Sequence, residues 1–113
     1  MDISVVIPLY NEEDSLYELC QWTKSSLSIA KFSFEIIFID DGSSDKSWNI
    51  IEELSKTNQN VKGLRFAKNY GKSQALNAGF NFAKGDFIAT LDADLQDSPE
   101  EIPSMIKKLN DEG

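Results

Sequence analysis

The sequence predicts an α/β fold of the Rossmann-like, three-layer α/β/α kind, built around a mainly parallel sheet. Short apolar runs alternate along the chain with segments of helical periodicity, strand then helix, four times over. The first two runs are almost continuous in Val, Ile and Phe, which is typical of parallel strands buried on both faces. Right-handed crossovers between such strands place helices on both faces of the sheet.

The four expected strands cover residues 3–9, 34–39, 61–66 and 86–91. A chain of 113 residues is long enough for one domain, residues 1–113, and no repeat or linker divides it. In open parallel sheets, ligands bind beyond the carboxyl ends of the strands, near the point where the strand order reverses. The residues that follow each strand are therefore the first candidates for a site.

The first two helical segments each present one apolar face. In the first segment, a stripe at three- and four-residue steps comprises Leu16, Leu19, Cys20, Thr23 and Leu27. Asn11 or Asp14 could cap its start. The second segment covers about residues 45–56, and its expected inward face comprises Trp48, Ile51 and Leu54. Both faces are expected to pack on the sheet.

The third helical segment carries Leu76, Gly79, Phe80 and Ala83 on one face and is expected to end at Lys84 and Gly85. Glycine lowers helix propensity, so Gly79 on a buried face indicates close packing against a neighbour. The fourth segment opens with a capping box and a proline, Ser98-Pro99-Glu100-Glu101. Because Pro103 is awkward inside a helix, regular helix is expected to begin only there.

Composition narrows the classes of function. The net charge is −8 with no His, which argues against a nucleic-acid surface. This acidic excess suits a site that collects divalent cations, and it also suits simple solubility. The single cysteine, Cys20, forms no intrachain disulfide and is expected in the core. No run of about 18 apolar residues and no signal-peptide pattern is found, so no transmembrane segment and a cytoplasmic location are expected.

Carboxylates cluster where three of the four expected strands end. Asp92 and Asp94 follow the fourth strand and stand two residues apart, so extended geometry points both side chains the same way. Hard oxygen ligands without His or Cys suit Mg²⁺ or Mn²⁺, which can bridge a diphosphate. Alone, the Asp-x-Asp pattern could be a polar turn. Its place at the end of a buried strand favours the metal site.

The ends of the first two strands carry further candidates. Asp40-Asp41-Gly42 could be a tight turn in which Gly42 takes positive φ. A carboxylate there could also accept the ring N–H of a pyrimidine or guanine base. Tyr10 could stack on that base, or it could simply cover a sheet edge. No Gly-x-Gly-x-x-Gly is found, so a dinucleotide-dependent oxidoreductase is not expected.

Taken together, these segments resemble glycosyltransferase family 2, the inverting enzymes of the A-type, nucleotide-diphospho-sugar transferase fold. The landmarks of this resemblance are Val6-Ile7-Pro8-Leu9-Tyr10-Asn11-Glu12, Ile39-Asp40-Asp41-Gly42-Ser43-Ser44-Asp45, Asn69-Tyr70-Gly71-Lys72 and Asp92-Ala93-Asp94-Leu95-Gln96-Asp97. The last two stretches look closest to the branch that transfers a sugar to dolichyl or undecaprenyl phosphate.

The resemblance implies a role for each matching residue. Nucleotide binding is implied for Pro8, Tyr10, Glu12, Asp40, Asp41, Lys72 and Asp92. A Mg²⁺ or Mn²⁺ ion is implied at Asp92, Asp94 and Gln96, with Asp94 as the catalytic residue. The implied activity is inverting, metal-dependent transfer from a UDP- or GDP-sugar to a lipid phosphate or a saccharide.

The family's catalytic domain is roughly twice this length, and its acceptor half is expected to follow Gly113. The chain is therefore expected to be the donor-binding part, inactive by itself in transfer, and placed at the cytoplasmic face of the membrane in the full-length protein. Its fourth strand is expected at a sheet edge, where an exposed apolar edge invites self-association.

Two other classes of protein fit part of the pattern. One is a non-catalytic nucleotide-binding module. The other is a Mg²⁺-binding receiver domain, whose length would suit. A receiver's acidic pair follows the first strand, however, and that place here holds Pro8-Leu9-Tyr10.

Overall fold

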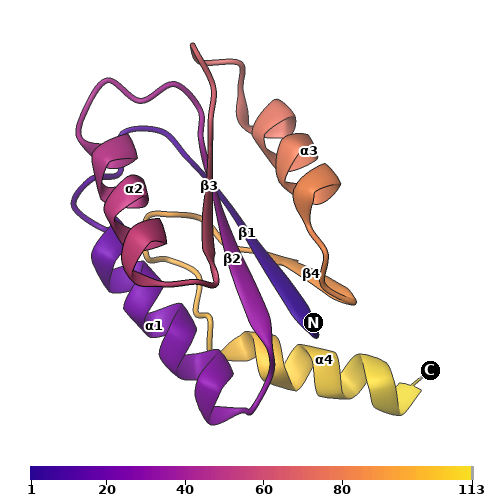
Figure 1. Cartoon of the computed structure of the whole chain (residues 1–113). Coiled ribbons are helices and arrows are strands. Elements are labelled where there is room, and N and C mark those ends of the chain that lie inside the picture. Colours follow the sequence, from indigo (N-terminus) through magenta and orange to yellow (C-terminus); the bar gives the residue numbers. More distant parts are fainter. Residues whose placement is uncertain (113) are drawn as a thin grey trace.

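A computed structural model describes residues 1–112 as a parallel sheet with helices on both faces (Figure 1). The elements alternate in chain order: β1 (Ile3–Leu9), α1 (Leu16–Ile29), β2 (Phe34–Asp40), α2 (Ser47–Thr57), β3 (Val61–Arg65), α3 (Lys72–Phe82), β4 (Phe87–Thr90) and α4 (Glu101–Glu112). The strand order is β3-β2-β1-β4, and every pairing is parallel. This arrangement confirms the predicted α/β fold.

The strand order reverses at β1, because β2 and β3 extend the sheet on one side and β4 is added on the other. The register pairs Ile3 of β1 with both Phe34 of β2 and Phe87 of β4, so the carboxyl ends of these strands meet at one edge. This is the crevice in which open α/β sheets bind ligands.

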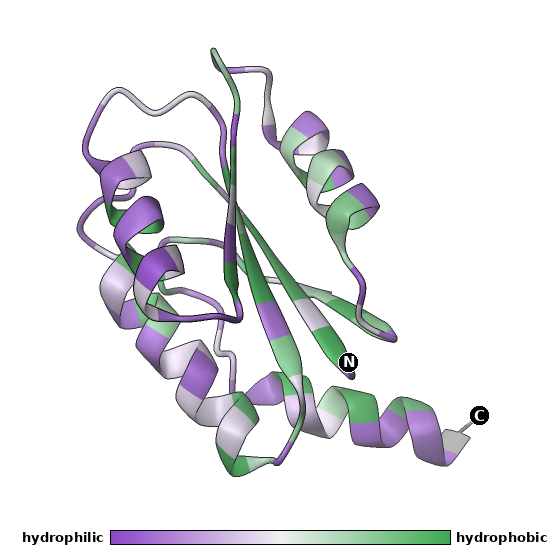
Figure 2. Cartoon of the chain, in the orientation of Figure 1, coloured by the Kyte–Doolittle hydropathy of each residue, from purple (hydrophilic) through white to green (hydrophobic). Residues whose placement is uncertain are grey.

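Two apolar clusters form the core, one on each face of the sheet. The larger cluster joins alternate residues of β1 and β2, such as Val5 and Phe38, to the inward faces of α1, α2 and α4. The smaller cluster joins Val6, Ile37 and Ile39 to Ala75 of α3. Figure 1 accordingly shows α1 and α2 on one side of the sheet and α3 on the other. The apolar colouring concentrates along β1 and β2 in Figure 2.

The predicted helix faces are confirmed for the first two helices. The stripe of α1 is wholly buried, including Cys20, and burial raises the pKa of the Cys20 thiol. In α2, Ile51 and Leu54 are buried and Trp48 is partly buried against the same core. Neither Asn11 nor Asp14 caps α1. The residue at the N-cap position of α1 is Ser15. The Asn11 amide oxygen instead accepts hydrogen bonds from the N–H groups of Ser44 and Asp45.

Gly79 packs as closely as its place on α3 indicates, since an added Cβ would lie 2.4 Å from Val6 Cγ1. Phe80 was expected on the same face, and this prediction is wrong. Its side chain is 43% exposed because it lies beside the groove between β4 and α4.

Lys84 and Gly85 do not form the expected helix end, because α3 stops at Phe82. Their N–H groups instead donate to a buried pair that joins β1 to β2. The Lys84 N–H reaches Glu35 Oε2 at 2.8 Å, and the Gly85 N–H reaches Ser4 Oγ at 2.8 Å. Ser4 Oγ in turn donates to Glu35 Oε2. These bonds fix the chain as it enters β4.

The helix α4 begins at Glu101, two residues before Pro103. Pro103 is therefore in the first turn, where its missing N–H would have had no partner within the helix. Among residues 1–112, no helix combines the length and apolar character needed to cross a bilayer.

Candidate donor site

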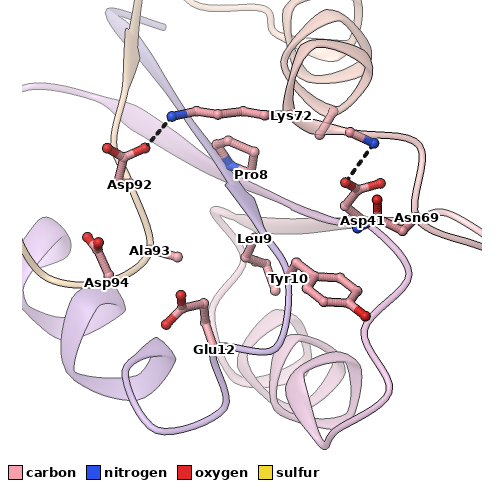
Figure 3. Close-up of a pocket in the computed structure, with 12 residues that line it drawn as sticks. Pro8, Leu9, Tyr10, Glu12, Asp41, Asn69, Lys72, Asp92, Ala93 and Asp94 are labelled. Atoms are coloured by element: carbon pink, nitrogen blue, oxygen red, sulfur yellow. Dashed lines mark hydrogen bonds and ion pairs between the residues drawn. The ribbon is translucent and has the colours of Figure 1, made fainter.

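A polar cavity of about 520 Å³ opens where the strand order reverses (Figure 3). Segments that follow β1, β2 and β4 form its walls together with the start of α3. The lining residues are Pro8, Leu9, Tyr10, Glu12, Asp41, Asn69, Gly71, Lys72, Ala75, Asp92, Ala93 and Asp94. Seven of the residues expected from the sequence therefore meet here: Pro8, Tyr10, Glu12, Asp41, Lys72, Asp92 and Asp94.

Hydrogen bonds between neighbouring loops hold the wall formed by the segment after β1. The Asn11 N–H donates to Ser43 Oγ at 2.8 Å, and the Glu12 N–H donates to Ser47 Oγ at 3.0 Å. Asn11 adopts a left-handed backbone with φ of 54°, a conformation that asparagine tolerates better than most residues. These bonds present Tyr10 and Glu12 to the cavity.

Asp41 ties the end of β2 to the segment before α3. Its Oδ1 accepts the Tyr70 N–H at 2.8 Å, and its Oδ2 accepts the Gly71 N–H at 3.0 Å. Gly71 has a φ of 106°, which favours glycine, and it directly precedes α3. Asp41 thereby fixes the start of α3, from which Lys72 reaches across the cavity.

Gly42 has the positive φ expected from the sequence, at 78°. A Cβ at this position would also lie 2.4 Å from the carbonyl carbon of Lys68. Both the turn and the close approach of the segment after β3 therefore require glycine here.

The segment after β4 forms a compact acidic turn. The Asp92 N–H donates to Asp97 Oδ2 at 3.0 Å, and the Gln96 N–H donates to Asp94 Oδ1 at 3.2 Å. Ser15 Oγ donates to the carbonyl oxygen of Ala93 at 2.5 Å and so anchors this turn to α1. The two carboxylates Asp92 and Asp94 are consequently held at the cavity.

Lys72 Nζ lies 2.7 Å from Asp92 Oδ1, and this ion pair crosses the cavity from α3 to the end of β4 (Figure 3). The hydrogen bond to Asp92 raises the pKa of Lys72, and the charges of Asp92, Asp97 and Asp94 act in the same direction. Figure 3 shows Asp92 and Asp94 on one side of the cavity and the Tyr10 ring with Asp41 on the other.

The structure does not bring Asp40 and Gln96 to the cavity. The Asp40 side chain is fully buried, and its Oδ1 accepts the Ser43 N–H at 2.8 Å. Its Oδ2 has no hydrogen-bond partner within the part of the chain that the structure describes. The Gln96 side chain is exposed and does not line the cavity. It follows Leu95, whose backbone is left-handed with a φ of 67°.

Some of the lining was not assigned from the sequence. Asn69 and Gly71 belong to a motif that the sequence displays, but only Lys72 was given a role. Their place after the third strand could have indicated that they line the cavity, because the carboxyl end of that strand lies at the same edge of the sheet. Ser15, which anchors the acidic turn, gave no comparable signal.

The donor atoms suit a hard divalent cation, because the cavity offers carboxylate oxygens and neither His nor Cys. Within residues 1–112, no three acidic, His or Cys side chains are grouped so that they could hold a metal by themselves. Mg²⁺ is commonly held by one or two carboxylates together with substrate phosphates. Asp92 and Asp94 fit that mode.

The topology and the cavity define a Rossmann-like domain with a ligand site at the reversal of its strand order. Comparison with known proteins then gives its family. Residues 4–113 match the sequence profile described as Glycosyl transferase family 2. The chain belongs to this family.

Three relatives illustrate the similarity. The chain is 46% identical over 106 residues to the undecaprenyl-phosphate 4-deoxy-4-formamido-L-arabinose transferase of Edwardsiella ictaluri, with 93% of this chain and 33% of that protein covered. It superposes with a TM-score of 0.76 on S. aureus TarS 1-349 in complex with UDP-GlcNAc, at 28% identity, covering 99% of this chain and 32% of the other.

A mannosyltransferase from Pyrobaculum calidifontis, PcManGT, whose structure contains GDP-Man and Mn²⁺, superposes with a TM-score of 0.77 at 21% identity, covering 95% of this chain and 32% of the other. This last likeness shows the fold alone. The chain thus spans about a third of the length of each of these relatives. The A-type glycosyltransferase fold expected from the sequence is confirmed.

Proposed function

We propose that this chain is the donor-binding part of an inverting, metal-dependent glycosyltransferase that uses a UDP- or GDP-sugar. The observation that carries the proposal is that the cavity has two unlike sides. The carboxylates of Asp92 and Asp94 lie on one side, and the Tyr10 ring lies on the other (Figure 3). The similarity to TarS, which was solved with UDP-GlcNAc, supports a nucleotide-sugar as the ligand.

We expect the cavity to bind a nucleoside diphosphate in one orientation. The base would lie against Tyr10, which is 47% exposed and so offers a ring face. The diphosphate would lie near the start of α3, since the amino end of a helix favours anions. Lys72 is the first residue of that helix and would approach the phosphates. Pro8, Glu12 and Asp41 would complete the nucleotide's surroundings.

Asp92 and Asp94 would hold Mg²⁺ or Mn²⁺ together with donor phosphate oxygens, and Asp94 would be the catalytic ligand. Such a cation supplies charge neutralisation as the nucleoside diphosphate leaves. In transfer, the bond from the anomeric carbon to the donor phosphate breaks as a bond to the acceptor oxygen forms on the opposite face. The configuration is thereby inverted. Gln96, which lies in the same acidic turn, would be a further metal ligand.

A polyprenyl phosphate is the favoured acceptor, with a saccharide as the alternative. The E. ictaluri relative is named as an undecaprenyl-phosphate sugar transferase. A phosphate monoester is largely ionised at neutral pH, because its second pKa is about 6, so it needs no base to become nucleophilic. A sugar hydroxyl does need one. The full-length protein would then work at the cytoplasmic face of a membrane, where its lipid acceptor is.

Calorimetric titration with UDP, GDP and GMP tests the donor site, in Mn²⁺, in Mg²⁺ and in EDTA. We expect both diphosphates to bind in the presence of a divalent cation and only weakly in EDTA, because carboxylates repel a diphosphate without one. We expect GMP, which lacks the second phosphate, to bind more weakly. Equal affinity of the diphosphates in EDTA and in Mn²⁺ would contradict the proposal.

A radiolabelled transfer assay with a polyprenyl phosphate separates donor binding from transfer. We expect no useful transfer by this chain alone, since positioning an acceptor supplies about 7–11 kcal/mol of the barrier reduction. Multiple-turnover transfer would place the acceptor site within these residues. Nucleotide binding with no transfer, also in a protein that extends this chain to the length of its relatives, would favour the alternative, a non-catalytic nucleotide-binding module.

A further inference from the structure

Lys72 occupies an unusual place for a cation. It is the first residue of α3, where the helix dipole disfavours positive charge. Its side chain nevertheless stretches across the cavity, and its ammonium meets Asp92 Oδ1 at 2.7 Å. This is the one salt bridge found among residues 1–112. A lysine that starts a helix and extends its ammonium into the cavity indicates a role in the cavity.

The ion pair covers the carboxylate that a cation would need. Asp92 and Asp94 both line the cavity, and Asp97 folds back on the same turn. Gathered like charges are unfavourable without a counter-ion. An ammonium at 2.7 Å takes up one lone-pair direction of Asp92 Oδ1 and repels any second cation beside it. Lys72 therefore stands where a divalent ion would bind.

The pair is also able to open. The two side chains are 64% and 49% exposed, and lysine carries its charge on a flexible four-carbon stem. Exposed ion pairs of this kind contribute little to stability, so the cost of separating them is small. The backbone at the base of the Lys72 side chain is held, because Asp41 accepts hydrogen bonds from the two residues just before α3.

We infer that the Lys72 ammonium is a built-in counter-ion that occupies Asp92 until the metal-bound donor displaces it. This inference rests on the proposed donor site. The arriving divalent cation takes over Asp92, and the released ammonium turns to the donor's diphosphate, which lies at the amino end of the same helix. Lys72 thus opposes the cation when it comes alone and favours it when it comes with a nucleotide.

This exchange predicts that removing the ammonium changes two affinities in opposite directions. Replacing the ammonium by an apolar group removes the competitor from Asp92, so a cation alone binds more tightly. The same change removes a charged contact to the diphosphate, so the nucleotide binds more weakly in saturating metal. A lysine that only touched phosphate would leave binding of the lone cation unchanged. One with a purely structural role would weaken both.

The test compares Lys72→Met with Lys68→Met in the 113-residue chain. The ammonium of Lys68 lies over the Tyr70 ring, 5.3 Å from its centroid, so the control removes an equal charge nearby without touching Asp92. Mn²⁺ affinity without nucleotide is measured from the electron paramagnetic resonance signal of the free ion. UDP affinity in saturating Mn²⁺ is measured by calorimetry.

We expect Lys72→Met to bind lone Mn²⁺ about two- to fivefold more tightly than Lys68→Met, the range set by a weak, exposed ion pair. We expect it to bind UDP about tenfold more weakly, as befits a lost charged hydrogen bond. Lys72→Arg, which keeps the charge, should bind lone Mn²⁺ like the wild type.

A Mn²⁺ affinity of Lys72→Met at or below that of Lys68→Met would overturn the inference, as would an absence of Mn²⁺ binding in both. The wild type separates this failure from failure of the proposed function. If the wild type binds UDP with Mn²⁺ and the two opposite changes in affinity are missing, only the counter-ion role is lost. If the wild type binds no nucleotide, the donor site itself is lost.

Discussion

Asp94 has no cationic partner among the described residues, and one of its carboxylate oxygens only accepts the N–H of Gln96. We predict that Asp94→Asn loses most of the metal-dependent affinity for UDP, tenfold or more, because a neutral amide is a poorer ligand for a hard cation. Asp86→Asn removes the same charge at the opposite end of β4 and should bind UDP normally. Calorimetry that found the two variants equal would contradict the assignment of Asp94.

Also at the residue scale, the pleat of a strand explains which candidates reach the cavity. Side chains alternate across a sheet. Asp40 lies in the same alternation as Ile36 and Phe38, whose side chains face α1 and α2. Asp41 lies in the alternation of Ile37 and Ile39, whose side chains face α3. The sequence placed both carboxylates at the strand end, but it could not show on which face of the sheet the cavity would open. Gln96 does not line the cavity, and the left-handed backbone of Leu95 before it gave no sequence signal.

At the scale of elements, Asp41 links β2 to α3 through two backbone N–H groups. Leaving a buried donor without an acceptor costs about 1–3 kcal/mol, and these two donors are only partly buried. We therefore predict a loss toward the lower end of the range for two donors, so that Asp41→Ala lowers the free energy of unfolding by about 2–4 kcal/mol. Urea denaturation measures this loss. Amide exchange of Tyr70 and Gly71 should quicken more than exchange elsewhere.

Asp14→Ala is the matched control for this substitution. Asp14 is exposed, and the structure gives its carboxylate no hydrogen bond, so the variant should unfold like the wild type. Equal effects of Asp14→Ala and Asp41→Ala would show that the link to α3 is dispensable.

The packing of α3 on the sheet depends on Gly79. An added Cβ would lie 2.4 Å from Val6 Cγ1 and 2.8 Å from Ile39 Cδ1. Overpacking of this kind costs about 1–3 kcal/mol, and the better helix propensity of alanine returns up to about 1 kcal/mol. We predict that Gly79→Ala is destabilised by about 1 kcal/mol in urea denaturation. Asn81→Ala, on the exposed side of α3, should be as stable as the wild type, and a stabilised Gly79→Ala would refute the packing argument.

Strands were easier to predict than helix faces. The nearly unbroken apolar runs of β1 and β2 are typical of buried parallel strands, and their observed ends agree with the predicted ones to within one residue. The face of α3 was harder, because α3 covers the sheet largely through two small residues, Ala75 and Gly79. Periodicity counted Phe80 as core, yet the side chain lies at an open groove.

At the scale of the whole molecule, β4 is an edge strand in the described sheet, and a groove of about 610 Å³ runs between it and α4. Large apolar side chains stand exposed along the groove: Phe80, Ile88, Met105 and Leu109. An unpaired apolar edge invites pairing with another copy. We predict that the 113-residue chain self-associates in a concentration-dependent way, as measured by light scattering.

Lysine on an edge strand discourages pairing, so Ile88→Lys should shift the chain toward monomer. Ile29→Lys is the control, since Ile29 is 82% exposed at the end of α1 and away from the groove. A wild-type chain that stays monomeric at high concentration would count against self-association through β4.

The proposed metal site is tested by the position of the metal ion in a crystal of this chain grown with UDP and Mn²⁺. The anomalous signal of manganese locates the ion without reference to any assumed site. We predict a peak about 2 Å from carboxylate oxygens of Asp92 and Asp94, shared with the diphosphate. We also expect the uracil against Tyr10 and Lys72 no longer paired with Asp92. A bound UDP with no manganese at these carboxylates would contradict the proposed metal site, and an intact Lys72–Asp92 pair beside it would contradict the counter-ion role of Lys72.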